Sequence, residues 1–388
     1  MRRIILAVAA GSLVVAGCSS NAKTAATTTT VPVVTNTALT TVAAPLDSST
    51  TTTIATTTTA PGPAKVQHVF VINLENTSYD ASFGAASKAP YLSKELTAKG
   101  ALLTQYFGTS HASLGNYIAQ ISGQGANPQT KADCFVYKDF VSTGQGANGQ
   151  EQGEGCVYPA NVKTIADQLD AAKLTWKSYQ EDMANSATDA KTCRHPAIGA
   201  NDTTVIARVG DQYATRHNPF VYFHSIIDSP TCDTSVVDLK QMTTDLASID
   251  TTANFNYITP NLCHDGHDNS CVDGTIGEIG GADEYLKSIV PTIMNSPAFK
   301  QDGLLIVTFD EAELSEPTPC CGEVGDGGGR VGAVLISPDR IKGGTVNDTP
   351  YNHFSLLCSI ENIFGLGHLG FAGAAGLACF DSLVAVKP

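Results

Sequence analysis

Two apolar runs of this sequence each end in a pair of polar side chains. Glu75 and Asn76 close the first run, and Asp310 and Glu311 close the second. Near-continuous apolar runs predict strands covered on both faces, as in a mainly parallel sheet, and the carboxyl ends of neighbouring parallel strands meet in one crevice. Because carboxylate and amide oxygens are hard ligands, the sequence predicts a divalent-cation site there. Either pair alone would equally fit a helix cap.

A serine at the start of a predicted helix is the candidate nucleophile. Small residues precede Ser113, and the apolar spacing of residues 114–121 predicts a helix that begins there. A helix N-terminus presents backbone N–H donors and the positive end of the helix dipole, which favour an anionic phosphoryl group at this hydroxyl. His111 would orient that group or donate a proton. Alternatively, Ser113 serves only as the helix N-cap.

Histidines gather in two further places. The segment 264–268 holds two histidines and two aspartates around a glycine that lets the chain turn, and His353 stands at the start of a later predicted helix. Neutral imidazoles ligate metal ions, and protonated ones neutralise phosphate charge or act as a general acid. We therefore expect these histidines near the cation site, whereas solvent exposure is the simpler expectation for His195 and His368.

These side chains need a scaffold of buried strands and amphipathic helices. Near-continuous apolar runs predict strands at 68–74, 254–259, 303–309 and 330–337. Apolar residues at three- and four-residue spacing predict helices at 164–172, 281–295 and 351–364. Because no internal repeat or second domain boundary occurs, residues 65–388 are expected to form one α/β domain.

The N-terminal segment differs in composition from the rest of the chain. Two arginines and a short apolar run predict an export signal in residues 1–17, and the sequence around Cys18 resembles a bacterial lipobox, whose cysteine becomes lipidated. An ordinary signal peptide followed by a chance cysteine is the alternative. Residues 19–64 are rich in threonine, alanine and proline, which predicts an unfolded stalk. We expect an exported protein anchored to the cell membrane only through the lipid on Cys18, at the outer surface or in a periplasm-equivalent space.

The remaining ten cysteines predict up to five disulfides, because an even number in an exported chain is typical of a disulfide framework. Pairing over short distances would staple local loops, and the pairs expected on this ground are Cys134–Cys156, Cys263–Cys271 and Cys358–Cys379. The partners of the other four cysteines stay open. A zinc site is less favoured, because no Cys-x-x-Cys pair occurs and Cys320 is adjacent to Cys321.

The charge balance excludes one large class of partner. The formal net charge is −14 and no block of lysine and arginine occurs, so a nucleic-acid-binding role has no electrostatic basis. A small phosphate ester is still compatible with this charge, because a metal ion and local dipoles invert the charge inside a pocket.

Five segments of the sequence together resemble the successive motifs of one family. They are 68–80, 111–117, 258–268, 309–312 and 351–355. In this order they look like the motifs of the bacterial phosphoesterase family, which contains acid phosphatases and phospholipases C and belongs to the alkaline-phosphatase-like superfamily. The likeness spans residues 66 to 380.

The resemblance implies a three-layer α/β/α sandwich with a mainly parallel central sheet and a transient phosphoserine at Ser113. By motif, the metal ligands would be Glu75, Asn76, Ser113, Asp310 and Glu311. The side chains around the phosphoryl oxygens would be His111, Asn116, His267 and His353. Asp265 and Asp268 would orient nearby histidines. The segment 216–222 also resembles a family segment, which would place His217 and Asn218 near the rim of the pocket.

The function expected from these features is that of a metal-dependent phosphomonoesterase. The cation would be one or more of Ca²⁺, Mg²⁺, Mn²⁺ or Zn²⁺, and the substrate a small phosphate ester or a phospholipid headgroup. Two departures from the family pattern are Ala112 and Gly115, which stand where relatives have prolines beside the nucleophile. Family phospholipases C tend to carry extra C-terminal domains, and because this chain ends at Pro388, soon after the predicted sheet, a monoesterase is favoured.

Three other functions are weighed against this one. A phospholipase C-like phosphodiesterase would use the same residues. A sulfatase would need an arginine shortly after the nucleophile, and the sequence Ser113-Leu-Gly-Asn lacks it. A non-catalytic surface-displayed binding protein would need none of the polar motif residues, and their presence speaks against it.

Overall fold

The computed structural model of this protein describes residues 65–268, 271–315, 318–321 and 327–385. The predicted signal sequence at 1–17, the lipobox cysteine Cys18 and the predicted stalk at 19–64 lie outside the described residues. Within those described ranges, no helix has the length and apolar character that crossing a bilayer requires.

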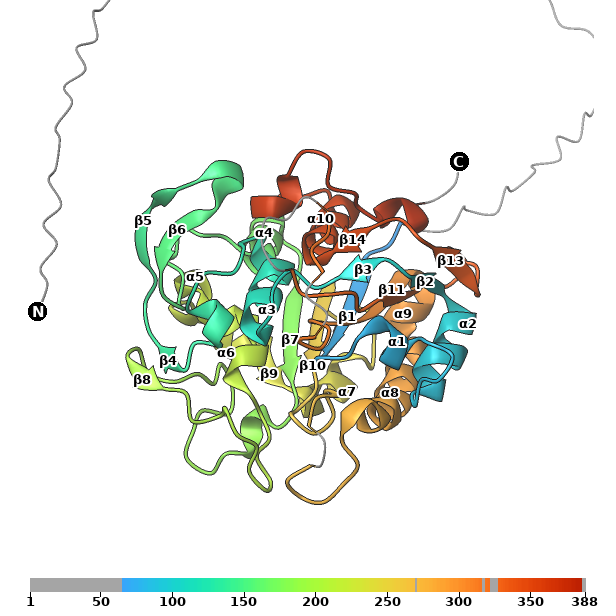
Figure 1. Ribbon diagram of the computed structural model, residues 1–388, viewed down its shortest axis with the longest axis horizontal. Coiled ribbons are helices and arrows are strands. Elements are labelled where there is room, and N and C mark those ends of the chain that lie inside the picture. Colours follow the sequence, from blue (N-terminus) through green and yellow to red (C-terminus); the bar gives the residue numbers. More distant parts are fainter. Residues whose placement is uncertain (1–64, 269–270, 316–317, 322–326, 386–388) are drawn as a thin grey trace, which may run out of the picture. The chain divides into compact units, whose positions relative to one another are not determined.

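An eight-stranded sheet forms the centre of the described residues, in the strand order β13-β2-β12-β11-β1-β10-β7-β9 (Figure 1). β12 runs antiparallel to both of its neighbours, and the other neighbouring pairs are parallel, which confirms a mainly parallel sheet. In chain order the bounds are β1 His68–Leu74, β2 Ala101–Leu103, β7 Trp176–Gln180, β9 Val236–Asp238, β10 Phe255–Thr259, β11 Gly303–Phe309, β12 Ala333–Ile336 and β13 Thr345–Asn347.

Shorter strands form two-stranded pairs outside this sheet. They are β3 Tyr106–Phe107 with β14 Tyr351–Asn352, β4 Val136–Tyr137 with β8 Ala200–Asn201, and β5 Val141–Gln145 with β6 Glu151–Glu154. The α-helices are α1 Tyr79–Ser82, α2 Thr97–Lys99, α3 Ser113–Ser122, α4 Ile165–Ala172, α5 His224–Ile227, α6 Thr231–Ser235, α7 Met242–Asp245, α8 Glu278–Asn295, α9 Pro297–Asp302 and α10 His353–Phe364.

Helices cover both faces of the sheet. On one face, Gln120 of α3 donates to Asn73 Oδ1 of β1 at 2.9 Å, and α10 packs beside α3. On the other face, Phe70 of β1 packs on Phe299 of α9 with ring centroids 6.2 Å apart, and α8 packs beside α9. Successive side chains of a strand point to opposite faces of the sheet. Phe70 and Asn73 are three positions apart, so their side chains, and the helices that they contact, lie on opposite faces. The predicted three-layer α/β/α sandwich is thereby confirmed.

Three predicted boundaries differ from those observed by two residues or more. The strand predicted at 330–337 shortens to β12, because Gly332 has a φ of 78° that breaks the extended run. The helix predicted at 351–364 begins at His353, because Asn352 caps it through a hydrogen bond from Ser355 N. The helix predicted at 281–295 begins earlier, at Glu278, and Ile279 of the added turn is buried against the core.

The three predicted disulfides are confirmed, and two more join the remaining cysteines. Cys134–Cys156, Cys263–Cys271 and Cys358–Cys379 each close a short loop as expected. The additional pairs are Cys193–Cys232, across 39 positions, and the adjacent Cys320–Cys321. Neither of these two could be chosen from spacing alone.

Candidate active site

The register between β1 and β11 brings the two predicted polar pairs together. Leu74 lies opposite Phe309 in the parallel ladder, so the residues that follow each strand are neighbours. Asp310 N donates to Leu74 O at 2.9 Å, and Asn76 N donates to Asp310 Oδ1 at 3.0 Å. Asn76 has a φ of 43°, a left-handed conformation that turns the chain sharply after β1.

Ser113 is the first residue of α3 and lies against Glu75. Its Oγ donates to Glu75 Oε2 at 2.6 Å, while Tyr117, one turn later on the helix, donates to Glu75 Oε1 at 2.5 Å. Ser113 is 4% exposed and Glu75 is 0% exposed. The preceding residue Ala112 has a φ of 77°, so the backbone turns abruptly into the helix where Ser113 begins it. Both oxygens of the Glu75 carboxylate are therefore engaged by hydroxyl groups of α3.

Glu311 holds the segment that leads into α3. Its carboxylate accepts hydrogen bonds from Ala112 N at 3.0 Å and is paired with His111 Nδ1 at 2.7 Å. The end of β11 is thereby tied to the residue before the candidate nucleophile. His111 lines the same pocket as Ser113.

The buried side chain of Asn116 hydrogen-bonds the backbone of the segment that precedes Ser113. Its Oδ1 accepts from Thr109 N at 2.8 Å and Ser110 N at 2.9 Å, and its Nδ2 donates to Ser110 O at 2.8 Å. The side chain is 0% exposed and does not line the pocket. Asn116 thus fixes the loop before Ser113, and its expected role beside the phosphoryl oxygens stays a prediction.

The side chain of Asn76 faces the two carboxylates of the second strand. One of the two terminal atoms of the Asn76 amide, nitrogen or oxygen, lies 3.1 Å from Glu311 Oε1 and 3.3 Å from Asp310 Oδ1. With nitrogen there, the amide donates to both carboxylates and its oxygen accepts from His267 Nε2 at 3.3 Å. With oxygen there, three acceptors converge, an arrangement that a bound cation favours.

These donors fit a divalent cation chemically. Glu75, Asn76, Asp310 and Glu311 supply oxygen ligands at one edge of the sheet, and Asp310 Oδ2 is buried without a hydrogen-bond partner among the described residues. The described His, Cys, Asp and Glu side chains contain one trio whose ligand atoms all lie within 4.8 Å, Cys263, Cys271 and Asp273, so the oxygens of Glu75, Asp310 and Glu311 are not gathered that closely. The two sulfurs of this trio form a disulfide with each other, so the trio is no metal site.

Burial makes the negative charge of this cluster unfavourable without a cation. Burial, and then the nearby Asp310 carboxylate, raises the pKa of Glu75 well above its usual value. Burial and the adjacent Glu311 raise the pKa of Asp310 well above its usual value. Burial, followed by the charge of Asp133, raises the pKa of Glu311 to about 8. A divalent cation would stabilise the ionised form of all three carboxyl groups.

The loop after β10 supplies a histidine to the pocket. His267 is exposed and lines the pocket, and its backbone N donates to Asp265 Oδ1 at 3.0 Å. Asp265 is 0% exposed, and its carbonyl accepts from Glu75 N at 2.8 Å. Asp268 Oδ1 lies 4.0 Å from His267 Nδ1. This loop is therefore attached directly to the end of β1.

His353 lies behind the carboxylates and outside the pocket. Its Nε2 is hydrogen-bonded to the carbonyl of Asp310, and its Nδ1 is 3.0 Å from Tyr106 Oη. It is 0% exposed, and burial lowers its pKa to about 4. The neutral, buried imidazole of His353 therefore binds the backbone of Asp310 and does not reach the pocket, where a leaving group would depart.

His217 is buried beneath the nucleophile. Its Nε2 lies 3.4 Å from Glu75 Oε2 and its Nδ1 3.7 Å from Asp265 Oδ2, and its ring stacks on Tyr117 with centroids 5.3 Å apart. Burial, and then the charge of Arg216, lowers its pKa well below the usual value. The expected position at the pocket rim is wrong for His217, which is 1% exposed. It is also wrong for Asn218, which is 0% exposed and donates to Tyr213 Oη.

Tyr117 and Arg216 are site residues that the sequence reasoning missed. Tyr117 follows Ser113 by one helical turn, a spacing that places both on one face of α3 and could have indicated its role. Arg216 is 8% exposed, lines the pocket beside Ser113 and lies 4.0 Å from Asp133 Oδ2. Its place at the start of the segment 216–222, which resembles a family segment, could have indicated a role for it.

The pocket above Ser113 has a volume of about 940 Å³. Its floor contains Asn76, Ser113 and Glu311, and its walls include His111, Arg216 and His267. Two exposed lysines, Lys88 and Lys131, also line it. Four carboxylates, Asp133, Glu278, Glu311 and Glu313, line the same pocket, so a bound cation would help to make it favourable for an anionic substrate.

Known proteins resemble this chain in sequence over most of the described residues. A phosphate-repressible acid phosphatase from Penicillium chrysogenum is 30% identical over 301 residues, which cover 76% of this chain and 58% of that protein. A phosphatidylinositol-3-phosphatase from Mycobacterium tuberculosis is 25% identical over 305 residues, which cover 79% of each. The chain spans about three fifths of the length of the fungal acid phosphatases it matches.

Similarity to solved structures is weaker. A protein of the alkaline phosphatase superfamily from Vibrio parahaemolyticus aligns with 78% of this chain and 67% of its own, with a TM-score of 0.45 and 12% identity. The sequence model of the Phosphoesterase family, in contrast, matches residues 85–367, well over half of the chain. This chain therefore belongs to the phosphoesterase family.

Proposed function

We propose that this protein is a metal-dependent phosphomonoesterase that forms a phosphoserine at Ser113. The observation that supports it most is the hydrogen bond from Ser113 to Glu75 at the N-terminus of α3. This hydroxyl lies at the floor of a pocket lined by Arg216 and His267. A helix N-terminus with basic side chains around it favours a phosphoryl group at that hydroxyl.

Ser113 begins the reaction as the nucleophile. Its Oγ attacks the phosphorus atom, and its proton passes to Glu75 Oε2, the acceptor of its hydrogen bond. Glu75, Asn76, Asp310, Glu311 and Ser113 would hold a divalent cation, which would lower the effective pKa of the hydroxyl and polarise a phosphoryl oxygen. Tyr117 and His217 keep the Glu75 carboxylate in position through their contacts with its two oxygens.

His267 acts as a general acid in the first half of the reaction and as a general base in the second. As the bond between phosphorus and the ester oxygen breaks, His267 donates a proton to the departing alcohol. Water then attacks the phosphoserine and gives a proton to His267, the bond between phosphorus and Oγ breaks, and Ser113 recovers its proton from Glu75. Arg216 stabilises the negative charge on the transferring group, since phosphoryl transfer depends mainly on positioning and charge neutralisation.

The names of two relatives support a monoester as the substrate. They are a phosphate-repressible acid phosphatase and a phosphatidylinositol-3-phosphatase, and both names describe a phosphatase. A phosphate monoester, free or on a lipid headgroup, is therefore the proposed substrate, and a phosphodiester is the second candidate. We also propose that the protein is exported and anchored at the cell surface through Cys18, on the evidence of its lipobox-like sequence.

The function is tested with the purified protein and its Ser113→Ala variant. The natural sequence is expected to hydrolyse p-nitrophenyl phosphate faster than bis-p-nitrophenyl phosphate, and Ser113→Ala to hydrolyse neither while keeping its fold. The matched control is Ser122→Ala, which removes a buried hydroxyl at the other end of the same helix. Near-normal turnover by Ser113→Ala would remove Ser113 from the mechanism, and a preference for the diester would favour the second candidate.

A further inference from the structure

The first turn of α3 is capped by a side chain from a distant part of the chain. Backbone N–H groups in the first turn of a helix have no acceptor within the helix. Ala112, which precedes Ser113, has no side-chain oxygen that could accept them. Leu114 N instead donates to Asp133 Oδ1 at 3.0 Å, although 19 positions separate the two residues. Asp133 is therefore bound to the residue directly after the proposed nucleophile.

The second oxygen of this carboxylate faces Arg216. Asp133 Oδ2 lies 4.0 Å from Arg216 Nε, and Arg216 Nη1 donates to Val205 O at 3.4 Å. Both Asp133 and Arg216 line the pocket above Ser113. One carboxylate thus contacts the helix of the proposed nucleophile and the arginine proposed to stabilise the transferring phosphoryl group.

The backbone around Asp133 is held in an uncommon conformation. The φ angle is 51° at Asp133 and 50° at Cys134, so two successive residues lie in the left-handed region, which residues other than glycine rarely adopt. Cys134 N donates to Gln129 O at 3.0 Å, and Cys134 is joined to Cys156 by a disulfide. These contacts fix the segment, so the Asp133 carboxylate reaches α3 from an anchored position.

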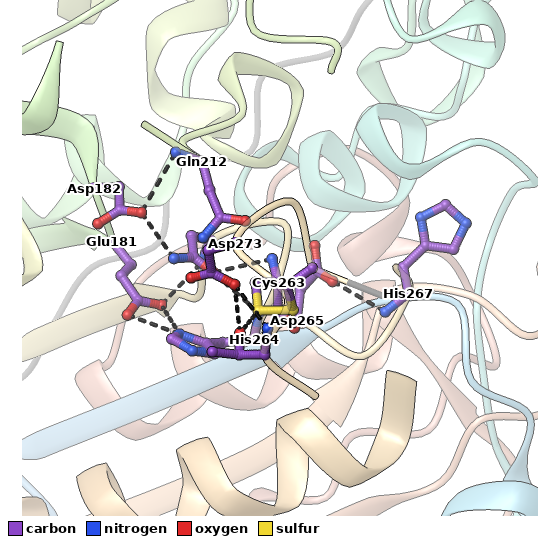
Figure 2. The surroundings of a disulfide bond; sticks show 11 residues. Glu181, Asp182, Gln212, Cys263, His264, Asp265, His267 and Asp273 are labelled. Atoms are coloured by element: carbon purple, nitrogen blue, oxygen red, sulfur yellow. Dashed lines mark hydrogen bonds and ion pairs between the residues drawn. A yellow bond between two sulfur atoms is a disulfide. The ribbon is translucent and has the colours of Figure 1, made fainter. Parts of the chain in front are cut away.

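A second disulfide anchors the segment that carries His267, the proposed general acid. Cys263 and Cys271 form that disulfide, and Figure 2 shows the His267 ring directed away from the two sulfur atoms. His267 and Asp133 line the same pocket. The pocket therefore takes side chains from two segments that are each held by a disulfide, an arrangement that keeps such side chains in position.

The charge of Asp133 does not favour binding of the proposed substrate. A phosphate monoester is an anion, and a carboxylate in its pocket repels it. Asparagine or serine would cap α3 about as well without that repulsion. A neutral cap, however, would not attract the guanidinium group of Arg216. The two contacts together therefore account for an acidic residue at this position.

We propose that Asp133 is a positioning residue for the phosphoesterase reaction, which fixes the first turn of α3 through Leu114 N and holds Arg216 at the pocket. This inference rests on the proposed function of Ser113. Asp133 does not touch the reacting atoms. It sets where the Ser113 hydroxyl and the Arg216 guanidinium lie, and a misplacement of about 1 Å at such groups costs about a hundredfold in rate.

The test compares Asp133→Ala with Asp133→Asn on p-nitrophenyl phosphate, with kcat expressed per folded molecule. Asp133→Ala loses both contacts and should lower kcat about a hundredfold. Asp133→Asn keeps an oxygen for Leu114 N, so its loss should be only about tenfold. KM should rise in neither variant, because a negative charge leaves the pocket. The control Asp139→Ala removes an exposed charge of the same segment outside the pocket and should change neither constant.

Arg216→Ala separates the two contacts in a double-mutant cycle. In that background Asp133→Asn should lower kcat no further, because the contact that it removes is already absent. Asp133→Ala should still lower kcat about tenfold in that background, through the lost cap on α3. A further loss in Arg216→Ala/Asp133→Asn equal to the loss in Asp133→Asn alone would overturn the link to Arg216.

Hydrogen exchange of the Leu114 amide, measured by NMR, tests the cap without turnover. Exchange should be slow in the natural sequence and in Asp133→Asn, and about tenfold or more faster in Asp133→Ala. Equal kcat in the two Asp133 variants, near-normal kcat in Asp133→Ala, or unchanged exchange of Leu114 in Asp133→Ala would each overturn the proposal. No turnover by the natural sequence would instead overturn the proposed function, and the exchange rates would still decide whether Asp133 caps α3.

Discussion

The Ser113 hydroxyl donates to Glu75 Oε2 at 2.6 Å, although 38 positions separate the two residues in the chain. The contact exists because β1 and α3 meet at the carboxyl edge of the sheet, where α3 covers the end of the strand. It joins the candidate nucleophile to the first of the buried carboxylates. Glu75 is both the proposed acceptor of the Ser113 proton and a proposed metal ligand. The same contact therefore joins the proposed nucleophile to the proposed cation site.

Removal of divalent cations is expected to abolish phosphatase activity, and one added divalent ion to restore it. Glu75→Gln should weaken metal binding by more than about tenfold, because it replaces a charged oxygen ligand at the centre of the cluster. Metal content by mass spectrometry and turnover of p-nitrophenyl phosphate measure the two effects. Glu313→Gln, at the exposed wall of the pocket, is the control and should change neither. Full activity in metal-free protein would rule out the cation.

His267→Asn is expected to slow substrates with poor leaving groups more than those with good ones. A general acid contributes about 10²- to 10⁴-fold when the departing alcohol needs a proton, and p-nitrophenol leaves readily without one. Turnover of glycerol phosphate should therefore fall by about a hundredfold or more, and that of p-nitrophenyl phosphate far less. The control His368→Asn changes an exposed histidine outside the pocket. An equal loss on both substrates would assign the proton to another group.

Glu361→Gln tests a buried carboxyl group remote from the proposed site. Burial raises the pKa of Glu361 from 4.5 to about 8, although Leu369 N donates to it. The native protein keeps this proton up to about pH 8 while the unfolded chain loses it near 4.5, so stability falls as the pH rises through that window. The expected loss is on the order of 4 kcal/mol. Urea unfolding at both ends of the window should show this loss in the natural sequence and a flatter profile in Glu361→Gln; identical profiles would contradict it.

Much of the scaffold could be predicted from the sequence because its signals are local. The apolar runs of β1 and β11 and the polar pairs after them stand out in the chain, and parallel strands bring such pairs to one edge. The helix that begins at Ser113 is likewise visible in its apolar spacing. What the sequence leaves open is that β1 and β11 are immediate neighbours, since pairing is a non-local property.

The residues whose positions differ from prediction lie on both irregular segments and regular helices. His217 ends the short helix Thr215–His217, which has no periodicity to reveal that its ring is buried against Tyr117. Asn116 and His353 stand in family motifs, yet their side chains hold backbone groups behind the pocket. Motif position fixes where a residue lies in the chain, whereas the direction of its side chain depends on packing.

Acid quenching during turnover, followed by peptide mass spectrometry, tests the proposed nucleophile most directly. The natural sequence mixed with p-nitrophenyl phosphate should yield a peptide containing Ser113 that carries one added phosphoryl group. Ser113→Ala should yield no such peptide and no turnover. Steady hydrolysis without phosphate on Ser113 at any quench time, or hydrolysis that continues in Ser113→Ala, would contradict a phosphoserine intermediate at this residue.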